Sequence, residues 1–585
     1  MLYGSPNEKS KFFTHNMFYR FLIPSMISSI GLSLGNIADA LVVGAKMGET
    51  GLAAIGLASP VFMIYNVFDL GIAIGGSVEY TKLLGEGKAK QGIRSFSQML
   101  YVTLFISVII AICGFFFLPH LLFVLGTVPA DGLLYLAAQS YVGILLVAAP
   151  LFFLNFLLYF YVRCDDNQKL ASIGFVAGNA VDIILNFVLV LGFDMGVKGA
   201  ILATVIGKMT AIGIYIPHLF LKWTILRVRL FKPDRKLVWS NFKNGFASSS
   251  QYLFQFFFFI IINNMLIRIG GERGLAVFDV VINVSYVLLS VYDGMGATIQ
   301  PLAGTFYGEK NRKAQRLTLV LAFQWGLALG VAAAIITGIF AGPVCTVFGL
   351  KAGTYELGVK AVRIYCTGTL IGGISIMMGY YYQAVEKGKL VFLINFLRTF
   401  AVYLAFSLFF GTLGIENFWW TFPATEALSF FLWILIRKYK MRMEHFENRF
   451  EESRIFCITI HKNEDFGILL SKVEEFCDRW NAGFARQYFV NLAVEEICQA
   501  IIDNGFTNKK DGYIEITLIA EEDNTFELHI RDNAIRYNPF DMKMHKIDRD
   551  NEDGIKSIGV FMVKNKAREF FYRRYQGFNT LTVKV

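Results

Sequence analysis

Charged residues are scarce in this chain. Asp, Glu, Lys and Arg make up 17% of its 585 residues, whereas soluble proteins average about 25%. Apolar residues reach 55%, with 57 Phe, which excludes intrinsic disorder and the fibrous classes. Cysteine is also rare: there are seven, with no CxxC pair, so a disulfide framework and a zinc ribbon are excluded. The composition therefore indicates a protein that lies mainly in a membrane.

Long apolar runs fill most of the first 440 residues. A helix of about 20 apolar residues crosses a bilayer core of roughly 30 Å, and this length predicts twelve transmembrane helices. Their expected ranges are 21–45, 52–82, 96–118, 135–161, 170–193, 196–221, 243–269, 275–303, 316–341, 356–384, 388–412 and 416–437. The fold class is thus mainly α, with a soluble tail after the last span.

Lysine and arginine are concentrated in alternate loops of this membrane part. Clusters lie at 82–94, 163–169, 222–243 and 310–316, whereas the other loops contain few positive charges. This asymmetry predicts a multi-pass protein of the inner (plasma) membrane with both termini in the cytoplasm. The tail from Glu451 carries 23 acidic and 19 basic residues, a balance that does not suggest a nucleic-acid partner.

Two loops indicate an internal repeat. Residues 85–88 (Gly-Glu-Gly-Lys) follow the second expected span, and residues 308–311 (Gly-Glu-Lys-Asn) follow the eighth. Six plus six helices with corresponding loops are typical of duplicated transporters, whose substrate site lies between the halves. The expected divisions are a first half at 1–221, a connector at 222–242, a second half at 243–440, a linker at 441–454 and a C-terminal domain at 455–585.

Characteristic short motifs occur along the membrane part. They are 23–26 (Ile-Pro-Ser-Met), 36–44 (Asn-Ile-Ala-Asp-Ala-Leu-Val-Val-Gly), 75–77 followed by 84–87, 182–186 followed by 196–204, and 300–302 (Gln-Pro-Leu) with Arg398 and Glu426. In this order they resemble the multidrug and toxic compound extrusion (MATE) family over about residues 1–440. The resemblance implies ion-coupled efflux by alternating access. Arg398 and Glu426 match family positions, and we interpret them as a structural buried pair.

Acidic side chains inside the expected spans are candidates for ion coupling, because a carboxylate within a bilayer is costly. Asp39 lies well inside the first span, with Asn36 one turn earlier on the same face. Asp182 and Asn186 share a face of the fifth span, and Thr204 adds a hydroxyl from the sixth. The MATE resemblance implies that such a cluster couples proton or sodium movement to efflux, with Asp39 as the main coupling carboxylate. Hydrogen bonding between helices is the alternative role.

Polar residues of the second half are candidates for lining the substrate cavity. They are Gln251 and Gln255 in the seventh expected span, and Asp279, Asn283 and Gln300 in the eighth. Asp279 and Asn283 are four residues apart and share one helix face. Packing between helices is the alternative role of each. The core of the tenth span contains no Asp or Glu, which argues against the second-half sodium site of one branch of the family.

The tail after the last span has a different pattern. Alternating residues predict strands at 455–461, 513–520, 525–531 and 569–585, the last range with a turn at Gln576-Gly577. Amphipathic stretches predict helices at 465–482 and 486–504. Helices that pack on an antiparallel sheet form a small α+β domain.

Three motifs of the tail surround Glu496, Asp532 and Gly559. In sequence and order they resemble the GHKL ATPase fold, especially the anti-sigma-factor serine kinases, over about residues 455–585. The resemblance implies that Glu496 is a catalytic base, that Asp532 recognises adenine and that Gly559 belongs to the phosphate-side segment. Ala500 stands where the family has a magnesium-binding asparagine, and alanine cannot ligate a metal. ATP binding and a degenerate regulatory or protein-binding domain remain the alternatives.

The membrane part also lacks a phosphate-binding Walker loop, because Gly87-Lys88 is followed by Ala89 instead of Ser or Thr. The energy source is then an ion gradient, with H⁺ or Na⁺ as coupling ion and no metal or further cofactor. We expect a secondary transporter and not an enzyme: it exports organic cations or amphipathic drugs, with membrane lipid and a cytoplasmic regulatory protein as further partners. The alternatives are a membrane-tethered signalling protein, whose tail sequesters or phosphorylates a regulator, and a lipid or precursor flippase.

Overall fold

The computed structural model describes most of the chain. Outside the described part are residues 1–8, 10, 126, 222–223, 349, 351, 463–465, 507–510, 524 and 542–551. For a further set of residues the structure describes the backbone but not the side chains: 32, 34, 36–41, 44–45, 48–50, 52–53, 131, 260, 263–264, 267, 272, 352, 439–452 and 552–557. Every statement below concerns the remaining residues.

The first half folds into long helices. α2 (Phe12–Gly85) continues through the first two expected spans, with Pro24 and Pro60 inside it. A 52° bend separates α4 from α5, and Pro150, which cannot donate a main-chain hydrogen bond, lies in the first turn of α5. The other bounds are α3 (Ala89–Leu125), α4 (Leu133–Val147), α5 (Ala149–Cys164), α6 (Gln168–Asn186) and α7 (Gly196–Tyr215).

The second half repeats this plan. α8 (Arg235–Gly308) contains the seventh and eighth expected spans and is interrupted at Gly271, whose φ of 59° is easily adopted by glycine. It begins inside the expected connector, because the Asp234 side chain caps it by accepting a hydrogen bond from the Leu237 N–H at 3.1 Å. The other helices are α9 (Arg312–Ile339), α10 (Ala341–Val347), α11 (Ala352–Ala384), α12 (Gly388–Phe396), α13 (Val402–Thr412), α14 (Ile415–Phe418) and α15 (Thr421–Ser453).

The described helices have the length and composition needed to cross a membrane. Nine of them qualify singly within the described residues, and the bent pair of α4 and α5 makes a tenth when it is counted as one span. The two other expected spans, 21–45 and 243–269, include side chains outside the described part. The mainly helical, multi-pass architecture expected from the sequence is therefore confirmed.

The two halves depart from regular α-helix at equivalent positions, as expected for an internal repeat. π-helical turns follow α6 at Phe187–Gly192 and α12 at Leu397–Ala401. The backbone has positive φ at Asp166 (70°), just before α6, and at Glu386 (57°), just before α12. The two halves thus share details of geometry that lie about 210 residues apart in the sequence.

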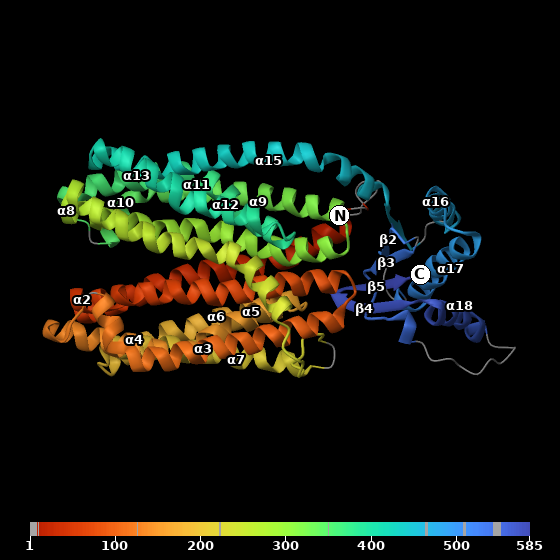
Figure 1. The fold of residues 1–585 in the computed structure, drawn as a ribbon, viewed down its shortest axis with the longest axis horizontal. Coiled ribbons are helices and arrows are strands. Elements are labelled where there is room, and N and C mark those ends of the chain that lie inside the picture. Colours follow the sequence, from red (N-terminus) through yellow and green to blue (C-terminus); the bar gives the residue numbers. More distant parts are fainter. Residues whose placement is uncertain are drawn as a thin grey trace.

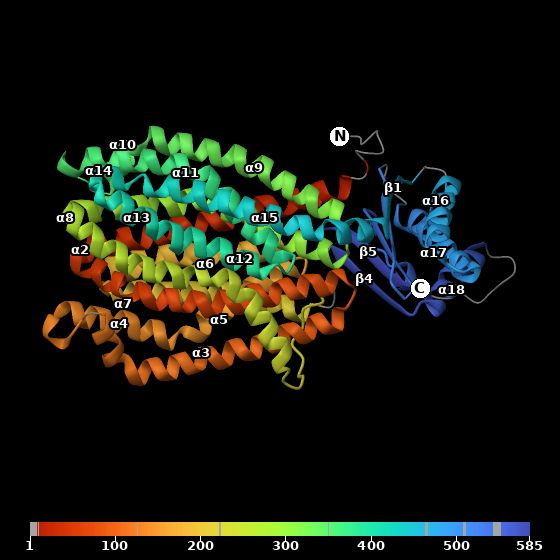
Figure 2. The ribbon, with the colours of Figure 1, turned by 45° about the horizontal axis from the view of Figure 1, so that its top comes forward.

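The halves lie side by side, with a small domain at one end (Figures 1 and 2). We call that end of the helical bundle, which carries residues 86–88, 165–167, 309–311 and 385–387, the domain end. Here α2 and α8 are in close contact: a Cβ atom at Gly85 would lie 2.4 Å from the Thr305 carbonyl oxygen. The Lys82 ammonium lies 2.8 Å from the Glu386 carboxylate of the other half. The two halves are therefore joined at the domain end.

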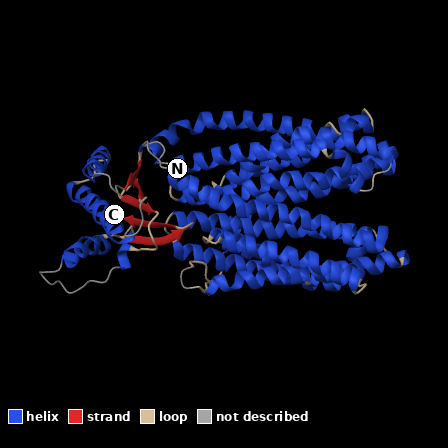
Figure 3. Cartoon of the chain, turned by 180° about the vertical axis from the view of Figure 1, so that it is seen from behind, coloured by secondary structure: helices blue, strands red, loops and turns tan. Residues whose placement is uncertain are grey.

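The C-terminal domain contains a five-stranded antiparallel sheet in the order β1-β2-β3-β5-β4. Its elements are β1 (Ile455–His461), α16 (Phe466–Arg479), α17 (Phe484–Gly505), β2 (Tyr513–Ala520), β3 (Phe526–Asp532), α18 (Glu552–Lys566), β4 (Glu569–Tyr575) and β5 (Phe578–Lys584). The predicted α+β domain is confirmed, although α18 was not among the predicted helices. The helices lie on the side of the sheet away from the bundle (Figures 1 and 3).

The alternation of β2 explains how the sheet is placed. Ile514, Ile516 and Leu518 join the core that the sheet forms with α16 and α17. Glu515 and Thr517 point to the opposite face, yet they are only 5% and 4% exposed. The polar face is buried because the helical bundle covers it.

Candidate transport site and domain junction

A polar cluster joins α6 and α7 in the first half. The Asn186 amide donates hydrogen bonds of 3.1 Å to a carboxylate oxygen and to the main-chain oxygen of Asp182, one helical turn earlier. The Thr204 hydroxyl of α7 interacts with the same carboxylate, which is 7% exposed. The structure thus brings together three of the five residues proposed for ion coupling.

Two charged residues of this cluster were missed by the sequence analysis. Lys208 lies one turn after Thr204 on α7, and its charge acts on both Asp182 and Asp69. Asp69, on α2, is 3% exposed. The spacing between Thr204 and Lys208 could have shown that they share a helix face, but nothing in the sequence shows that Asp69 lies beside them.

Glycine allows this close arrangement of α6 and α7. A Cβ atom at Gly207 would lie 2.5 Å from the Gly178 carbonyl oxygen and 3.1 Å from the Asp182 Cβ atom. Small residues commonly let membrane helices approach closely. This close approach of the two helices brings Lys208, on α7, near enough for its charge to act on Asp182.

The side chains of Asn36 and Asp39 lie outside the described residues. Their helix, α2, passes through both positions and also carries Asp69. The proposed contribution of Asn36 and Asp39 to ion coupling therefore stays a prediction.

The residues of the second half that were expected to line the substrate cavity differ in burial and in hydrogen-bond partners. Asp279 is exposed, and the Asn283 amide donates to its main-chain oxygen at 2.9 Å and not to its carboxylate. Gln251 hydrogen-bonds the neighbouring Tyr252 hydroxyl, while Gln255 is half-buried. Gln300 is 1% exposed and accepts a hydrogen bond from Arg163. The structure places Gln300 in the contact between the halves, since its partner belongs to the first half.

A partly buried ion pair also lies in the second half. The Arg398 Nε atom is 2.8 Å from both carboxylate oxygens of Glu426. The two residues therefore form the expected pair, but it is only partly buried, with 12% and 17% of the two side chains exposed. Asp293 lies near the charge of Arg398, and its carboxylate is 3.4 Å from the Tyr380 hydroxyl. Asp293 thus lies close enough to that pair for the charge of Arg398 to act on it.

The nucleotide-binding motifs of the C-terminal domain are occupied by the protein's own groups. Asp532 is 2% exposed, and one of its oxygens accepts hydrogen bonds from Asn579 (2.7 Å) and from the Ala534 N–H (2.8 Å). A Cβ atom at Gly559 would lie 2.0 Å from the Glu496 carboxyl carbon, so Glu496 fills the space beside α18. Ala500 offers no metal ligand where the family has its magnesium-binding asparagine, whereas Asp532 and Glu496 are both present beside this position, so nucleotide binding by the domain stays a prediction.

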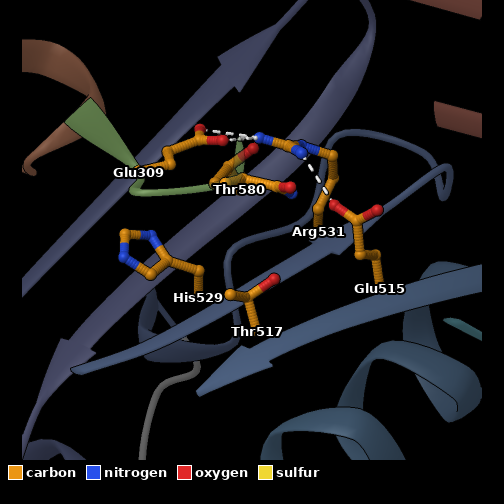
Figure 4. A pocket seen from close by; sticks show the side chains of 7 residues that line it. Glu309, Glu515, Thr517, His529, Arg531 and Thr580 are labelled. Carbon is orange, nitrogen blue, oxygen red and sulfur yellow. Dashed lines mark hydrogen bonds and ion pairs between the residues drawn. The ribbon is translucent and has the colours of Figure 1, made fainter. Parts of the chain in front are cut away.

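A buried charge network joins the domain to the bundle. Glu309, at the domain end, is 3% exposed. The Arg531 Nη2 atom lies 2.6 Å from both of its carboxylate oxygens, and the Arg573 Nη2 atom lies 3.2 Å from one of them. Arg531 also contacts Glu515 at 2.8 Å (Figure 4). Burial would raise the pKa of Glu309, but the charges of Arg531 and Arg573 outweigh burial and hold that pKa below its ordinary value.

Further contacts tie the domain to both halves. The Gln576 N–H in the β4–β5 turn donates to Asp166, and the Gln576 carbonyl accepts from Arg20. Both partners belong to the first half. In the second half, the Lys310 ammonium lies 2.6 Å from the Glu521 carboxylate. We call this whole contact, with the Glu309 network at its centre, the junction.

Family models match both parts of the chain. The model described as MatE matches residues 24–188 and 248–408, which is more than half of the chain. The model described as Histidine kinase-like ATPase domain matches residues 462–585.

Similar proteins and structures agree with these matches. The Multidrug export protein MepA of Staphylococcus saprophyticus is 23% identical over 434 residues, covering 72% of this chain and 92% of its own length. MepA of Staphylococcus aureus is 22% identical over 433 residues, with the same coverage. An outward-facing MATE family transporter has a TM-score of 0.69 and 22% identity, covering 75% of this chain and 97% of its own. A MOP superfamily transporter from Pyrococcus furiosus, with the same identity and coverage, has a TM-score of 0.68.

The two-half helical fold, with a charged cluster enclosed in its first half, defines a multi-pass membrane transporter. The chain belongs to the MatE family, and its C-terminal domain has the histidine kinase-like ATPase fold. Both resemblances found in the sequence are confirmed.

Proposed function

We propose that this protein exports organic cations or similar amphipathic drugs by proton-coupled antiport, in the plasma membrane, with both termini in the cytoplasm. The observation that carries the proposal is the enclosed Asp182 cluster. Asp182 lies about 20 Å along α6 from Gln168 at the domain end, given a rise of 1.5 Å per residue. The curated relatives are named multidrug export proteins, which supports the substrate class.

Lys208 favours protons over sodium as the coupling ion. Its ammonium already acts as a counter-charge to both Asp69 and Asp182, so a sodium ion would have to compete with Lys208 for the same carboxylates. Protonation of Asp182 instead removes its charge and weakens its attraction for Lys208. This change gives α6 and α7 two electrostatic states, one with the carboxylate charged and one with it neutral.

Efflux is tested by drug accumulation in cells that lack their own multidrug exporters. Cells that produce this protein should accumulate several-fold less ethidium than cells that carry an empty vector. Equal accumulation of ethidium and of other organic cations, with the protein present in the membrane, would contradict the proposed substrate class.

The proposal also assigns a regulatory role to the C-terminal domain. One sheet contacts Asp166 and Arg20 of the first half and Glu309 and Lys310 of the second. In alternating access, the halves rock against each other and open each end in turn. A rigid sheet bonded to both halves therefore stabilises the state in which the domain end is closed. The same contacts occupy the polar face of the sheet, which favours regulation of the transporter over capture of a separate regulator by that face.

Docking of the domain is expected to depend on pH through Asp166. Burial raises the pKa of Asp166 to about 7, and Asp165 adds to the rise, whereas the Gln576 N–H, Arg573 and Arg574 act in the opposite direction. An undocked Asp166 would return toward its ordinary pKa of 3.8. The docked state therefore binds more protons than the undocked state. The stabilisation of docking that comes from protonating Asp166 is fully present below about pH 4 and is lost as the pH rises through 7.

The pH dependence can be measured from the distance between spin labels on Lys389 and Lys472. The undocked fraction should be several-fold larger at pH 8 than at pH 6. Asp166→Asn should remove most of this difference, because the amide does not titrate. A difference of the same size in Asp166→Asn would assign the effect to another group.

A further inference from the structure

A cavity of about 270 Å³ lies beside the Glu309 network, between the C-terminal domain and the first half. The bundle contributes Asp165, Asp166 and the segment around His218. The domain contributes Arg574 and other residues of β4, together with Arg536. The cavity is lined by both carboxylates and guanidinium groups. Whether it suits a cation or an anion therefore depends on which of these groups still have hydrogen-bonding capacity for a ligand.

The carboxylates of the cavity are already satisfied by the protein. Asp165 accepts hydrogen bonds from the Tyr80 hydroxyl (2.6 Å) and the Leu226 N–H (3.0 Å), and it contacts His218 Nε2 at 3.0 Å. Asp166 accepts from the Gln576 N–H. Asp165 therefore has little capacity left for a ligand, and Asp166 is already engaged by the domain.

The guanidinium groups, in contrast, have donors to spare. Among the described residues, neither Arg536 nor Arg574 has a carboxylate within 4 Å. Arg573 is 5% exposed, and its Nη1 atom is buried without a hydrogen-bond partner. A buried donor without a partner costs free energy, and three guanidinium groups around one cavity favour an anion.

We propose that this cavity binds a phosphate group, carried either by a small cytoplasmic solute or by an anionic lipid headgroup. Guanidinium forks match phosphate oxygens with paired hydrogen bonds. The volume suits a nucleoside monophosphate or a lipid headgroup and is below that of a typical drug pocket. Because the cavity is lined by both the first half and β4, an occupant strengthens docking. This last step rests on the proposed regulatory role of the domain.

Binding is tested on the full chain in phosphatidylcholine nanodiscs, titrated with inorganic phosphate and with AMP. Arg574→Gln should weaken saturable binding at least tenfold. Arg479→Gln is the matched control, because Arg479 lies on α16 and forms a surface pair with Glu475, and it should leave binding unchanged. The thermal unfolding profile of Arg574→Gln shows whether this variant is folded. If it is not folded, Arg536→Gln replaces it in the same titration.

The lipid source is tested in nanodiscs that contain phosphatidylglycerol. Lipid retained by the wild-type protein in native mass spectrometry and lost in Arg574→Gln identifies a headgroup as the occupant. Binding of neither phosphate source, or binding that is equal in wild type and Arg574→Gln, overturns the proposal. The assay requires no transport, so a negative result here leaves ion-coupled efflux and the effect of the Glu309 network standing.

Discussion

Asp182→Asn is expected to abolish gradient-driven efflux while the protein still inserts in the membrane. Asparagine keeps the size of the side chain and a carbonyl oxygen for the Asn186 amide, but it does not gain or lose a proton. Removal of a proton-transfer group typically costs a factor of a hundred or more in rate, and a loss of about this size is expected here. The measurement is the initial rate of ethidium efflux from loaded cells at matched protein levels.

Asp194→Asn provides the matched control for Asp182→Asn. Asp194 forms an exposed pair with Lys46, with 74% of its side chain exposed, so this variant should transport normally. Asp39→Asn should behave like Asp182→Asn if both carboxylates couple the same ion. Normal efflux by Asp182→Asn would remove Asp182 from the mechanism, whatever the result for Asp39.

Glu309→Gln is expected to release the C-terminal domain and to open the domain end. The substitution leaves Arg531 and Arg573 buried without their shared carboxylate. Loss of one partner from a buried ion pair costs about 3 to 5 kcal/mol, which is large beside the other contacts of the junction. Spin labels on Lys90 and Lys313, which lie in corresponding helices of the two halves, should show a clear shift to longer distances.

Glu521→Gln tests whether the burial of Glu309 matters. It removes the carboxylate that contacts Lys310, whose side chain is 48% exposed. Exposed pairs contribute at most about 1 kcal/mol, so this variant should keep the wild-type distances. If Glu309→Gln also kept the wild-type distances, the junction would not hold the two halves together.

The sequence is informative where the physical signal is local. Asp182 and Asn186 are four residues apart, and this spacing alone brings their side chains together on a helix. Apolar length predicts the membrane spans, and alternating residues predict the strand regions of the C-terminal sheet. The start of α8 was expected several residues too late, because Asp234 was not recognised as a helix cap.

Contacts between distant segments could not be predicted in this way. Glu309 was recognised as part of a repeated loop, yet Arg531 lies 222 residues further along the chain. The polar alternation of Glu515 and Thr517 on an otherwise apolar strand is a signal that one sheet face meets charged groups. Asp279 and Asn283 have the spacing that was expected to bring them together, but their bond involves the main chain, since a side chain can also satisfy a helical carbonyl four residues earlier.

Transport into sealed vesicles, with the pH and sodium gradients imposed separately, tests the proposed coupling most directly. In inside-out vesicles, a pH gradient alone should drive uptake of an organic cation by the wild-type protein and not by Asp182→Asn, while a sodium gradient alone should drive none. Uptake that follows the sodium gradient and ignores the pH gradient would contradict proton coupling at the Asp182 cluster.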